Sequence, residues 1–203
     1  YPSVNKSYVI QQEREGLGHA IWLTKNTVNP ESEAVIILGD TIMELDLKSF
    51  LNQPGSSLGV KKVSDPRIFG VAEVNEKNII TKVVEKPSIP KSNMALVGLY
   101  KIKRFGDLAD AIDYNIKNNI RNNNEFFLTD GLQQMIQRGE VFTAFKIDNW
   151  YDCGQREVLL QTNALLLRKN WQAKEPKRIS YENTIIVEPV YIGENADIQN
   201  SII

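Results

Sequence analysis

Short apolar runs that alternate with helix-like segments restrict how this chain can fold. Residues 35–39 read VIILG, which is typical of a strand buried on both faces. Residues 17–28 precede this run, and their apolar positions recur at three- and four-residue spacing, which predicts a helix. Residues 7–11 (SYVIQ) predict an earlier strand, and a short helix is expected near residues 45–51. This β-α-β-α order predicts parallel strands with crossover helices, and therefore an α/β sandwich.

The middle of the chain continues both kinds of pattern. Strands are predicted at residues 57–63, 70–75, 78–85, 95–102 and 141–147. Helices are predicted at residues 106–118, 129–138 and 156–170. Together these segments predict one main domain over residues 1–172.

The last part of the chain has a different period. Isoleucines recur every six residues, and a second set of small or apolar residues follows four positions behind: Ile186, Ile192 and Ile198, then Val190, Ala196 and Ile202. This pattern matches the hexapeptide repeat of a parallel β-helix, although a chance period over so short a stretch is the alternative. We therefore predict a linker at residues 173–183 and the start of a left-handed parallel β-helix at 184–203. Because such repeats are stable only when stacked, further coils are expected.

Composition excludes several classes of protein. Lysine plus arginine (24) nearly balances aspartate plus glutamate (25), so no overall field attracts the chain to nucleic acid or to a membrane surface. No apolar stretch approaches the roughly 20 residues of a membrane span. The single cysteine, Cys153, excludes an internal disulfide, and the single His19 excludes a Cys/His zinc cluster. A cytoplasmic setting is expected.

Two carboxylates follow predicted strands. Asp40 comes directly after VIILG, where ligands of an open parallel sheet bind, although capping or starting a turn is the competing explanation. Asp152, in NWYDCGQ, follows residues 141–147, and its competing role is to cap the next helix. Two such groups could hold one Mg²⁺ while phosphate oxygens complete its octahedron.

Two further stretches suggest ligand binding. Gln11 ends a predicted strand, and a loop then enters a helix at Gly16-Leu17-Gly18, where amide groups can reach an anionic ligand. The side chain of Gln11 could offer both a donor and an acceptor to the edge of a base. Glu85 and Lys86 end another strand and could serve sugar hydroxyls and a phosphate, or simply form a solvent-facing ion pair. His19 and Cys153 are interpreted as structural residues.

The order and spacing of these stretches resemble one enzyme family. The motifs are QQEREGLGHA, VIILGD, RIFGVAEV, VVEKPSIPKSN, ALVGLYKI, EFFLTD and WYDCG, and they span about residues 7–170. They resemble sugar-1-phosphate nucleotidyltransferases, above all glucose-1-phosphate thymidylyltransferases and their uridylyltransferase relatives. The resemblance implies a Rossmann-like sandwich. It also implies an Mg²⁺-dependent reaction of dTTP or UTP with a sugar 1-phosphate, glucose in particular, to give a nucleotide-sugar and pyrophosphate.

The same resemblance implies a role for each candidate residue. Gln11 and Gly16 would contact the base, and Asp40 and Asp152 would bind Mg²⁺. The sugar pocket would be lined by Gly70, Glu85, Val97 and Glu125. Lys86 would contact the phosphate of the sugar. Because a sugar phosphate is already ionised, it can attack without a general base. Catalysis would then consist of positioning and charge neutralisation by Mg²⁺ and Lys86.

One motif of that family does not occur in this sequence. Its members carry a glycine-rich loop, followed by an arginine and a lysine, that holds the triphosphate. We therefore expect the sandwich to be incomplete at its N-terminus and this chain alone to be inactive. The alternative is a non-catalytic homologue that binds nucleotide-sugars or serves regulation. An acyltransferase role for the tail is disfavoured because no histidine follows His19. β-Helix tails of this kind lead us to expect a homo-oligomer.

Overall fold

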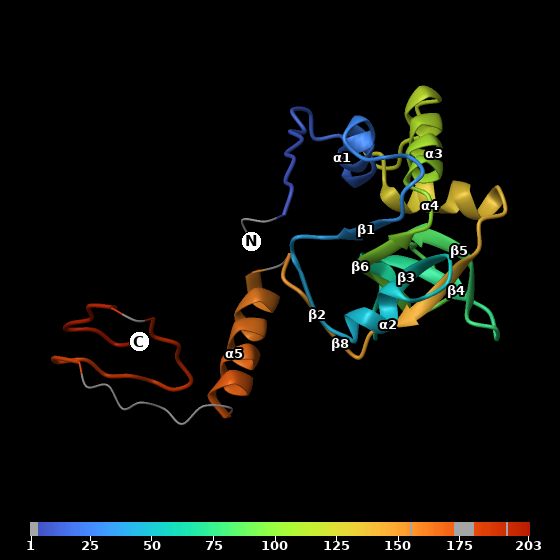
Figure 1. Cartoon of the computed structure of the whole chain (residues 1–203). Coiled ribbons are helices and arrows are strands. Elements are labelled where there is room, and N and C mark those ends of the chain that lie inside the picture. Colours follow the sequence, from blue (N-terminus) through green and yellow to red (C-terminus); the bar gives the residue numbers. More distant parts are fainter. Residues whose placement is uncertain (1–3, 155, 173–180, 194) are drawn as a thin grey trace. The chain divides into compact units, whose positions relative to one another are not determined.

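The computed structural model describes residues 4–154, 156–172, 181–193 and 195–203. The chain divides into two compact units, Tyr1–Trp150 and Tyr151–Ile203. The first contains a mixed sheet with helices packed against it (Figure 1). The second contains a long helix and the tail.

The sheet of the first unit has six strands in the order β1-β6-β3-β7-β5-β4. Their bounds are Ala34–Ile37 (β1), Ser56–Lys62 (β3), Gly70–Val74 (β4), Ile79–Glu85 (β5), Met94–Ile102 (β6) and Phe142–Lys146 (β7). Each of these six segments overlaps a strand predicted from the sequence. Two short strands that were not predicted, β2 (Thr41–Glu44) and β8 (Asn149–Asp152), form a separate two-stranded sheet.

The strand directions correct the prediction of a parallel sheet. Within the six-stranded sheet only β3 and β7 pair in parallel, whereas β6 pairs antiparallel with β1, with β3 and with β4. The prediction was wrong because it assumed that successive strands pair with each other. Instead β6, which comes later in the chain, lies between β1 and β3. Since β6 also reaches β4, the pairings β6–β3–β7–β5–β4–β6 form a closed circuit.

Helices cover both sides of this sheet. Helices α1 (Leu17–Leu23), α3 (Phe105–Lys117) and α4 (Leu128–Gln137) share the larger core with the strands, and Leu108, Ile112 and Leu132 are almost completely buried there. Helix α2 (Leu47–Leu51) contributes Phe50 to a second, smaller core with Val97, Leu99 and Ile147. Figure 1 shows α1, α3 and α4 grouped on one side and α2 on the other. The predicted helices are therefore confirmed.

Two helices show how local chemistry sets their limits. Helix α2 begins after Asp46, whose carboxylate accepts a hydrogen bond from the backbone N–H of Ser49. Helix α1 is shorter than predicted because the chain tightens into the 3₁₀ helix η1 (Thr24–Asn26). The hydroxyl of Thr24 donates to the carbonyl of Ile21 at that point. A second 3₁₀ turn, η2 (Pro66–Ile68), precedes β4.

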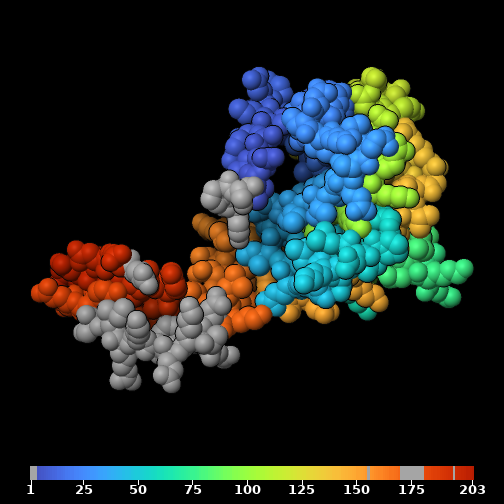
Figure 2. Space-filling model, in the orientation of Figure 1, coloured from blue at the N-terminus to red at the C-terminus, as the bar shows by residue number. Residues whose placement is uncertain are grey.

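Two expectations for the N-terminal part were wrong. Residues 7–11 contain no strand, and Tyr8 and Ile10 are 87% and 80% exposed, because no described strand pairs with them. Strand β1 is not buried on both faces, since Val35 and Ile37 are 40% and 57% exposed. The reason is that β1 lies at the edge of the sheet, with β6 as its neighbour on one side. Figure 2 shows the blue segment around β1 at the surface of the first unit.

The second unit begins within β8 and continues as helix α5 (Arg156–Gln172). The predicted linker lies mostly outside the described residues. In the tail, Ile185 and Ile202 form a parallel bridge, and Ile203 donates a backbone hydrogen bond to Ile185. The predicted domain limits remain predictions. No helix in the described ranges is long and apolar enough to cross a membrane.

Candidate functional site

The turn that carries Asp40 is held against an irregularity in β6. The backbone N–H of Leu38 donates to Gly98 O at 2.9 Å, and the hydroxyl of Thr41 donates to Val97 O at 2.9 Å. These carbonyls are available because the register between β3 and β6 shifts here, and Gly98 has a φ of 80°. Asp40 is exposed, and none of the described residues forms a hydrogen bond or ion pair with its carboxylate. Its oxygens therefore remain open to a ligand.

Val97 enters this arrangement through its backbone. Its side chain is 1% exposed and packs in the smaller core, where its Cγ2 also crowds the position that a Cβ on Gly59 would occupy. The hydroxyl that binds its carbonyl also accepts from Trp150 Nε1 at 2.7 Å. The backbone of Val97 thus contacts the turn that carries Asp40, whereas its side chain lies in the smaller core.

Glu85 lies in a small, half-buried cluster with Gly70 and Thr129. Its Oε2 accepts a hydrogen bond from Thr129 Oγ1 at 2.9 Å. A Cβ built on Gly70 would lie 3.1 Å from the same oxygen and 3.0 Å from Thr129 Cγ2. Burial raises the pKa of Glu85, an effect opposed by the hydrogen bond from Thr129 and by the charge of Lys86. Gly70 therefore leaves one side of this carboxylate, whose charged form is disfavoured by burial, without a covering side chain.

Lys86 follows directly and has an unusual backbone. Its φ is 40°, in the left-handed region, and its N–H donates to Phe69 O at 3.0 Å. A non-glycine residue in this region stores strain and persists only where its surroundings fix it. The side chain is exposed, with Nζ 5.9 Å from the centre of the Phe127 ring. The cation is thus held at the end of β5, beside Glu85.

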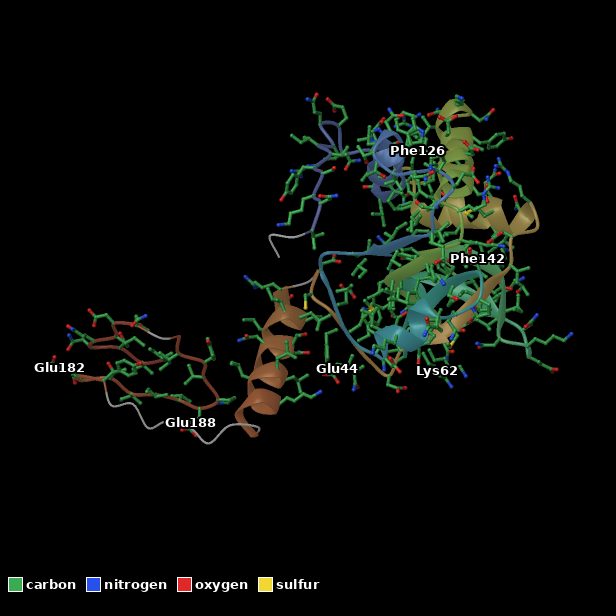
Figure 3. The ribbon with its side chains drawn as sticks, in the orientation of Figure 1. Glu44, Lys62, Phe126, Phe142, Glu182 and Glu188 are labelled. Carbon is green, nitrogen blue, oxygen red and sulfur yellow. The ribbon has the colours of Figure 1, made fainter. Side chains whose placement is uncertain are left out.

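The loop before α1 is fixed by close backbone packing. Gly18 N donates to Phe126 O at 2.8 Å, and Phe126 N donates to Glu15 O at 2.8 Å. A Cβ on Gly16 would lie 2.8 Å from Phe126 O, and one on Gly18 would lie 2.7 Å from the same atom. Figure 3 shows Phe126 beside α1. Both glycines are therefore required for packing, and this close approach holds Gln11, whose amide nitrogen donates to Gly16 O at 3.0 Å.

Most of the predicted residues belong to one continuous region of the first unit. A Cβ on Gly16 would lie 2.9 Å from Glu125 Cβ, and the charge of Glu125 acts on Glu85. Tyr100 is buried, and this burial is the main cause of its raised pKa. The negative charges of Glu85 and Asp40 raise this pKa further. The loop and the carboxylate cluster therefore lie close together, and Glu85 and Asp40 are both near enough to Tyr100 for their charges to raise its pKa.

Asp152 belongs to the second unit. Its Oδ1 accepts from the N–H of Gly154 at 3.1 Å, so it stabilises a turn ahead of α5 and leaves Oδ2 free of a described protein partner. Cys153 is half-buried, and with the described residues its thiol forms a single weak hydrogen bond, from Sγ to Tyr151 O at 3.9 Å. Among the described residues no group of three or more His, Cys, Asp or Glu side chains could hold a metal ion.

Three residues of this region were not singled out from the sequence. Thr129 and Asp130 are the last two residues of EFFLTD, and burial raises the pKa of Asp130. Tyr100 lies within the strand motif ALVGLYKI. The motifs themselves were the available signal, but a contact such as Thr129 to Glu85 joins positions far apart in the chain and leaves no local pattern.

This combination of a mixed sheet, helices on both sides and a strand-end carboxylate cluster is the mixed α/β fold of sugar nucleotidyltransferases. UDP-glucose pyrophosphorylase, solved with UDP-glucose, superposes with a TM-score of 0.66 at 26% identity, covering 80% of this chain and 66% of that one. The family model described as nucleotidyl transferase matches residues 2–169. The chain therefore belongs to the nucleotidyl transferase family.

Curated relatives agree with this assignment. A low-salt glycan biosynthesis nucleotidyltransferase, Agl11, from Haloferax volcanii is 31% identical over 170 residues, which are 81% of this chain and 46% of that protein. A glucose-1-phosphate thymidylyltransferase from Streptomyces griseus is 28% identical over 204 residues, covering 96% of this chain and 54% of that protein. The chain thus spans about half the length of the curated relatives it matches.

Proposed function

We propose that the protein to which this chain belongs joins a nucleoside triphosphate, dTTP or UTP, to a sugar 1-phosphate and releases pyrophosphate. The observation that carries the proposal is the Glu85 cluster. A half-buried carboxylate is fixed by Thr129, left uncovered by Gly70 and followed by the cation of Lys86. A carboxylate accepts hydrogen bonds from sugar hydroxyls, and an adjacent ammonium group attracts a phosphate.

In the proposed reaction an oxygen of the sugar phosphate attacks the α-phosphorus of the nucleotide. The new bond joins that oxygen to the phosphorus, while the bond from the α-phosphorus to the bridging oxygen breaks and pyrophosphate leaves. Because the attacking oxygen is already ionised, no protein group has to remove a proton. The tasks of the chain are to orient both substrates and to counter their charge, with Lys86 on the sugar phosphate.

Magnesium is the cation that these residues suit. Asp40 in the first unit and Asp152 in the second each offer a carboxylate, a hard oxygen ligand of the kind Mg²⁺ prefers. When bound, Mg²⁺ would neutralise charge on the phosphate oxygens. Substrate phosphates and water would supply further ligands, because Mg²⁺ takes an octahedral set of oxygens.

The tail supports a second, smaller proposal, that residues 184–203 form the first coil of a left-handed parallel β-helix. Ile186, Ile192 and Ile198 are half-buried, whereas their neighbours Ile185, Val187 and Tyr191 are 62%, 62% and 79% exposed. The parallel bridge from Ile185 to Ile202 joins positions 17 residues apart, one residue short of three six-residue units and close to one coil. The cytoplasmic setting and the homo-oligomer expected from the sequence remain predictions.

The catalytic proposal is tested by two measurements. Calorimetric titration of this chain with UDP-glucose and dTDP-glucose measures binding, and pyrophosphate release by the product of the complete gene measures turnover. We expect Glu85→Gln to weaken UDP-glucose binding about 10- to 100-fold, because the carboxylate acceptor of a sugar hydroxyl is lost. We expect Asp40→Asn to lower turnover at least about 100-fold and chelation of Mg²⁺ to abolish it.

A surface substitution provides the control. Glu31→Gln removes an exposed carboxylate that pairs with Arg104 and lies outside the cluster, and it should leave both readings unchanged. Turnover that persists in a metal chelator would contradict the reaction. Tight nucleotide-sugar binding without turnover by the complete gene product would instead identify a binding or regulatory homologue.

A further inference from the structure

The amide nitrogen of Gln11 uses both of its hydrogens inside the protein. It donates to Gly16 O at 3.0 Å and lies 3.1 Å from Nδ1 of His19. An amide nitrogen can donate but cannot accept, so Nδ1 must be the acceptor. Nδ1 of His19 therefore carries no proton, and the ring proton is on Nε2. This nitrogen faces Glu15 Oε2 at 3.6 Å.

The His19 ring is held in this orientation from several sides. It is stacked on Trp22 with 5.7 Å between ring centres, and its side chain is only 12% exposed. Trp22 is anchored in turn, since its Nε1 donates to Asp113 Oδ1 of α3 at 3.0 Å and Lys25 Nζ lies 3.7 Å from its ring centre. The ring therefore has little freedom to turn away from Gln11.

Glu15 is the charged group that directly faces the imidazole, and it too is fixed. Its other oxygen, Oε1, lies 3.0 Å from a guanidinium nitrogen of Arg121. Arg121 in turn lies over the ring of Phe126 at 4.3 Å. The negative charge of the carboxylate thus lies 3.6 Å from Nε2, where it attracts a proton on that nitrogen and so favours the same tautomer.

This arrangement leaves one polar atom of Gln11 without a described protein partner. None of the residues that the structure describes donates a hydrogen bond to Oε1 of Gln11, and the residue is half-buried. The sequence alone allowed this side chain to offer a donor and an acceptor. With both N–H groups engaged, Gln11 can offer a ligand only an acceptor.

We propose that His19 is a positioning residue that sets the orientation of the Gln11 amide and so restricts this loop to bases with an imino N–H. Uracil and thymine carry a proton on N3 that can reach Oε1, whereas N3 of cytosine is an acceptor and would face the oxygen repulsively. The inference rests on the proposed function, in which Gln11 contacts the base, and adds the residue that decides which base is accepted.

The test compares UDP-glucose with CDP-glucose, which differ only in the base, by calorimetric titration. We expect this chain to prefer UDP-glucose about 10- to 100-fold, the range expected when a wrong base leaves a polar group unpaired. His19→Phe keeps an aromatic ring against Trp22 but removes the acceptor, so one N–H of Gln11 is released. The preference should then fall to within about threefold.

His19→Asn is the matched control, because its side-chain oxygen can replace Nδ1 as an acceptor close to the same position. It should restore most of the preference for UDP-glucose. An unchanged preference in His19→Phe would overturn the inference, and so would an Asn variant that behaves like the Phe variant. A purely structural role predicts equal losses for both nucleotide-sugars.

A second measurement does not depend on nucleotide binding. The chain has one histidine, so ¹⁵N NMR of its ring gives one pair of nitrogen signals. We expect the tautomer protonated on Nε2, and a shift of the Nδ1 signal in Gln11→Leu. Protonation on Nδ1 would overturn the inference. Equal binding of the two nucleotide-sugars would overturn it while the proposed function stands, whereas failure to bind either would count against both.

Discussion

Strands β1 and β6 are neighbours with similar composition, yet they occupy opposite environments. Eight of the nine residues of β6 are buried, whereas β1 alternates between half-buried and exposed positions. The contrast is sharpest at one cross-strand pair, in which Leu99 is 1% exposed and Ile37, directly opposite, is 57% exposed. The difference shows that burial depends on the position of a strand in the sheet as well as on its own hydrophobicity, since α2 covers Leu99 through Phe50 and β1 lies at the edge.

The largest expected effect tests this pair directly. Leu99→Ala should lower the free energy of unfolding by about 2–5 kcal/mol, because it opens a cavity in a fully buried core. Ile37→Ala removes a similar number of methyl groups and should cost less than about 1 kcal/mol, because more than half of that side chain is already in water. Urea unfolding followed by circular dichroism measures both. Equal losses would mean that β1 is covered in solution and would remove the contrast.

A smaller effect is expected from two glycines that meet where the turn after β1 contacts β6. Gly98 has a φ of 80°, and a Cβ there would lie 3.0 Å from Leu38 Cγ. Gly98→Ala should therefore cost about 1–3 kcal/mol through backbone strain and crowding. Gly39→Ala, in the adjacent motif, meets nothing within 4 Å and is the matched control, with an expected change within about 0.5 kcal/mol. Thermal unfolding of the two variants measures the difference.

A stable Gly98→Ala variant would show that the shift in register is not needed to hold the Asp40 turn. In that case the hydrogen bonds from Leu38 and Thr41 to β6 would have to be the main restraint on that turn. A destabilised Gly39→Ala variant would show instead that the turn is closely covered. Either result would change how the open position of Asp40 is explained.

The same contrast separates what the sequence could predict from what it could not. Period and turn residues predicted the strands from 57–63 to 141–147 and the helices α3, α4 and α5, because these signals are local. They did not predict that β6 lies between β1 and β3, since strand order depends on long-range pairing. Residues 7–11 read as a strand by composition but have no described partner strand, so local propensity alone was insufficient.

The site divides in a similar way. The order of motifs was enough to select Gln11, Asp40, Glu85 and Lys86 and to associate them with one family. It could not reveal that Thr129 donates a hydrogen bond to Glu85 or that the ring of His19 lies within hydrogen-bond distance of the Gln11 amide nitrogen. The second of these contacts spans only eight residues, but it depends on the direction of a ring that no sequence pattern specifies. His19 was consequently interpreted as structural, and the proposal above gives that position a testable effect on base selection.

The smallest expected effect concerns charge, because a covered region also penalises ionised groups. Burial raises the pKa of Asp130 above its ordinary value of 3.8, so the folded protein binds its proton more tightly than the unfolded chain does. Its contribution to stability is therefore greatest below about pH 3.8 and is lost as the pH rises through the folded pKa. Asp130→Asn should remove this loss. Between acid and neutral pH its free energy of unfolding should rise relative to wild type by about a few tenths of a kcal/mol, a small effect because solvent screens a half-buried group.

Asp113 on α3 provides a comparison of opposite sign. A hydrogen bond from Lys117 is the main cause of its lowered pKa, with a smaller contribution from Trp22. The unfolded chain therefore binds the proton more tightly, and the stabilisation is present above pH 3.8 and disappears as the pH falls through the folded pKa. Asp113→Asn should thus lose stability at neutral pH and little in acid. Urea unfolding of both variants at several pH values measures how the free energy of unfolding, relative to wild type, changes with pH. Changes of the same sign in the two variants would contradict the burial of Asp130 as the cause of its raised pKa.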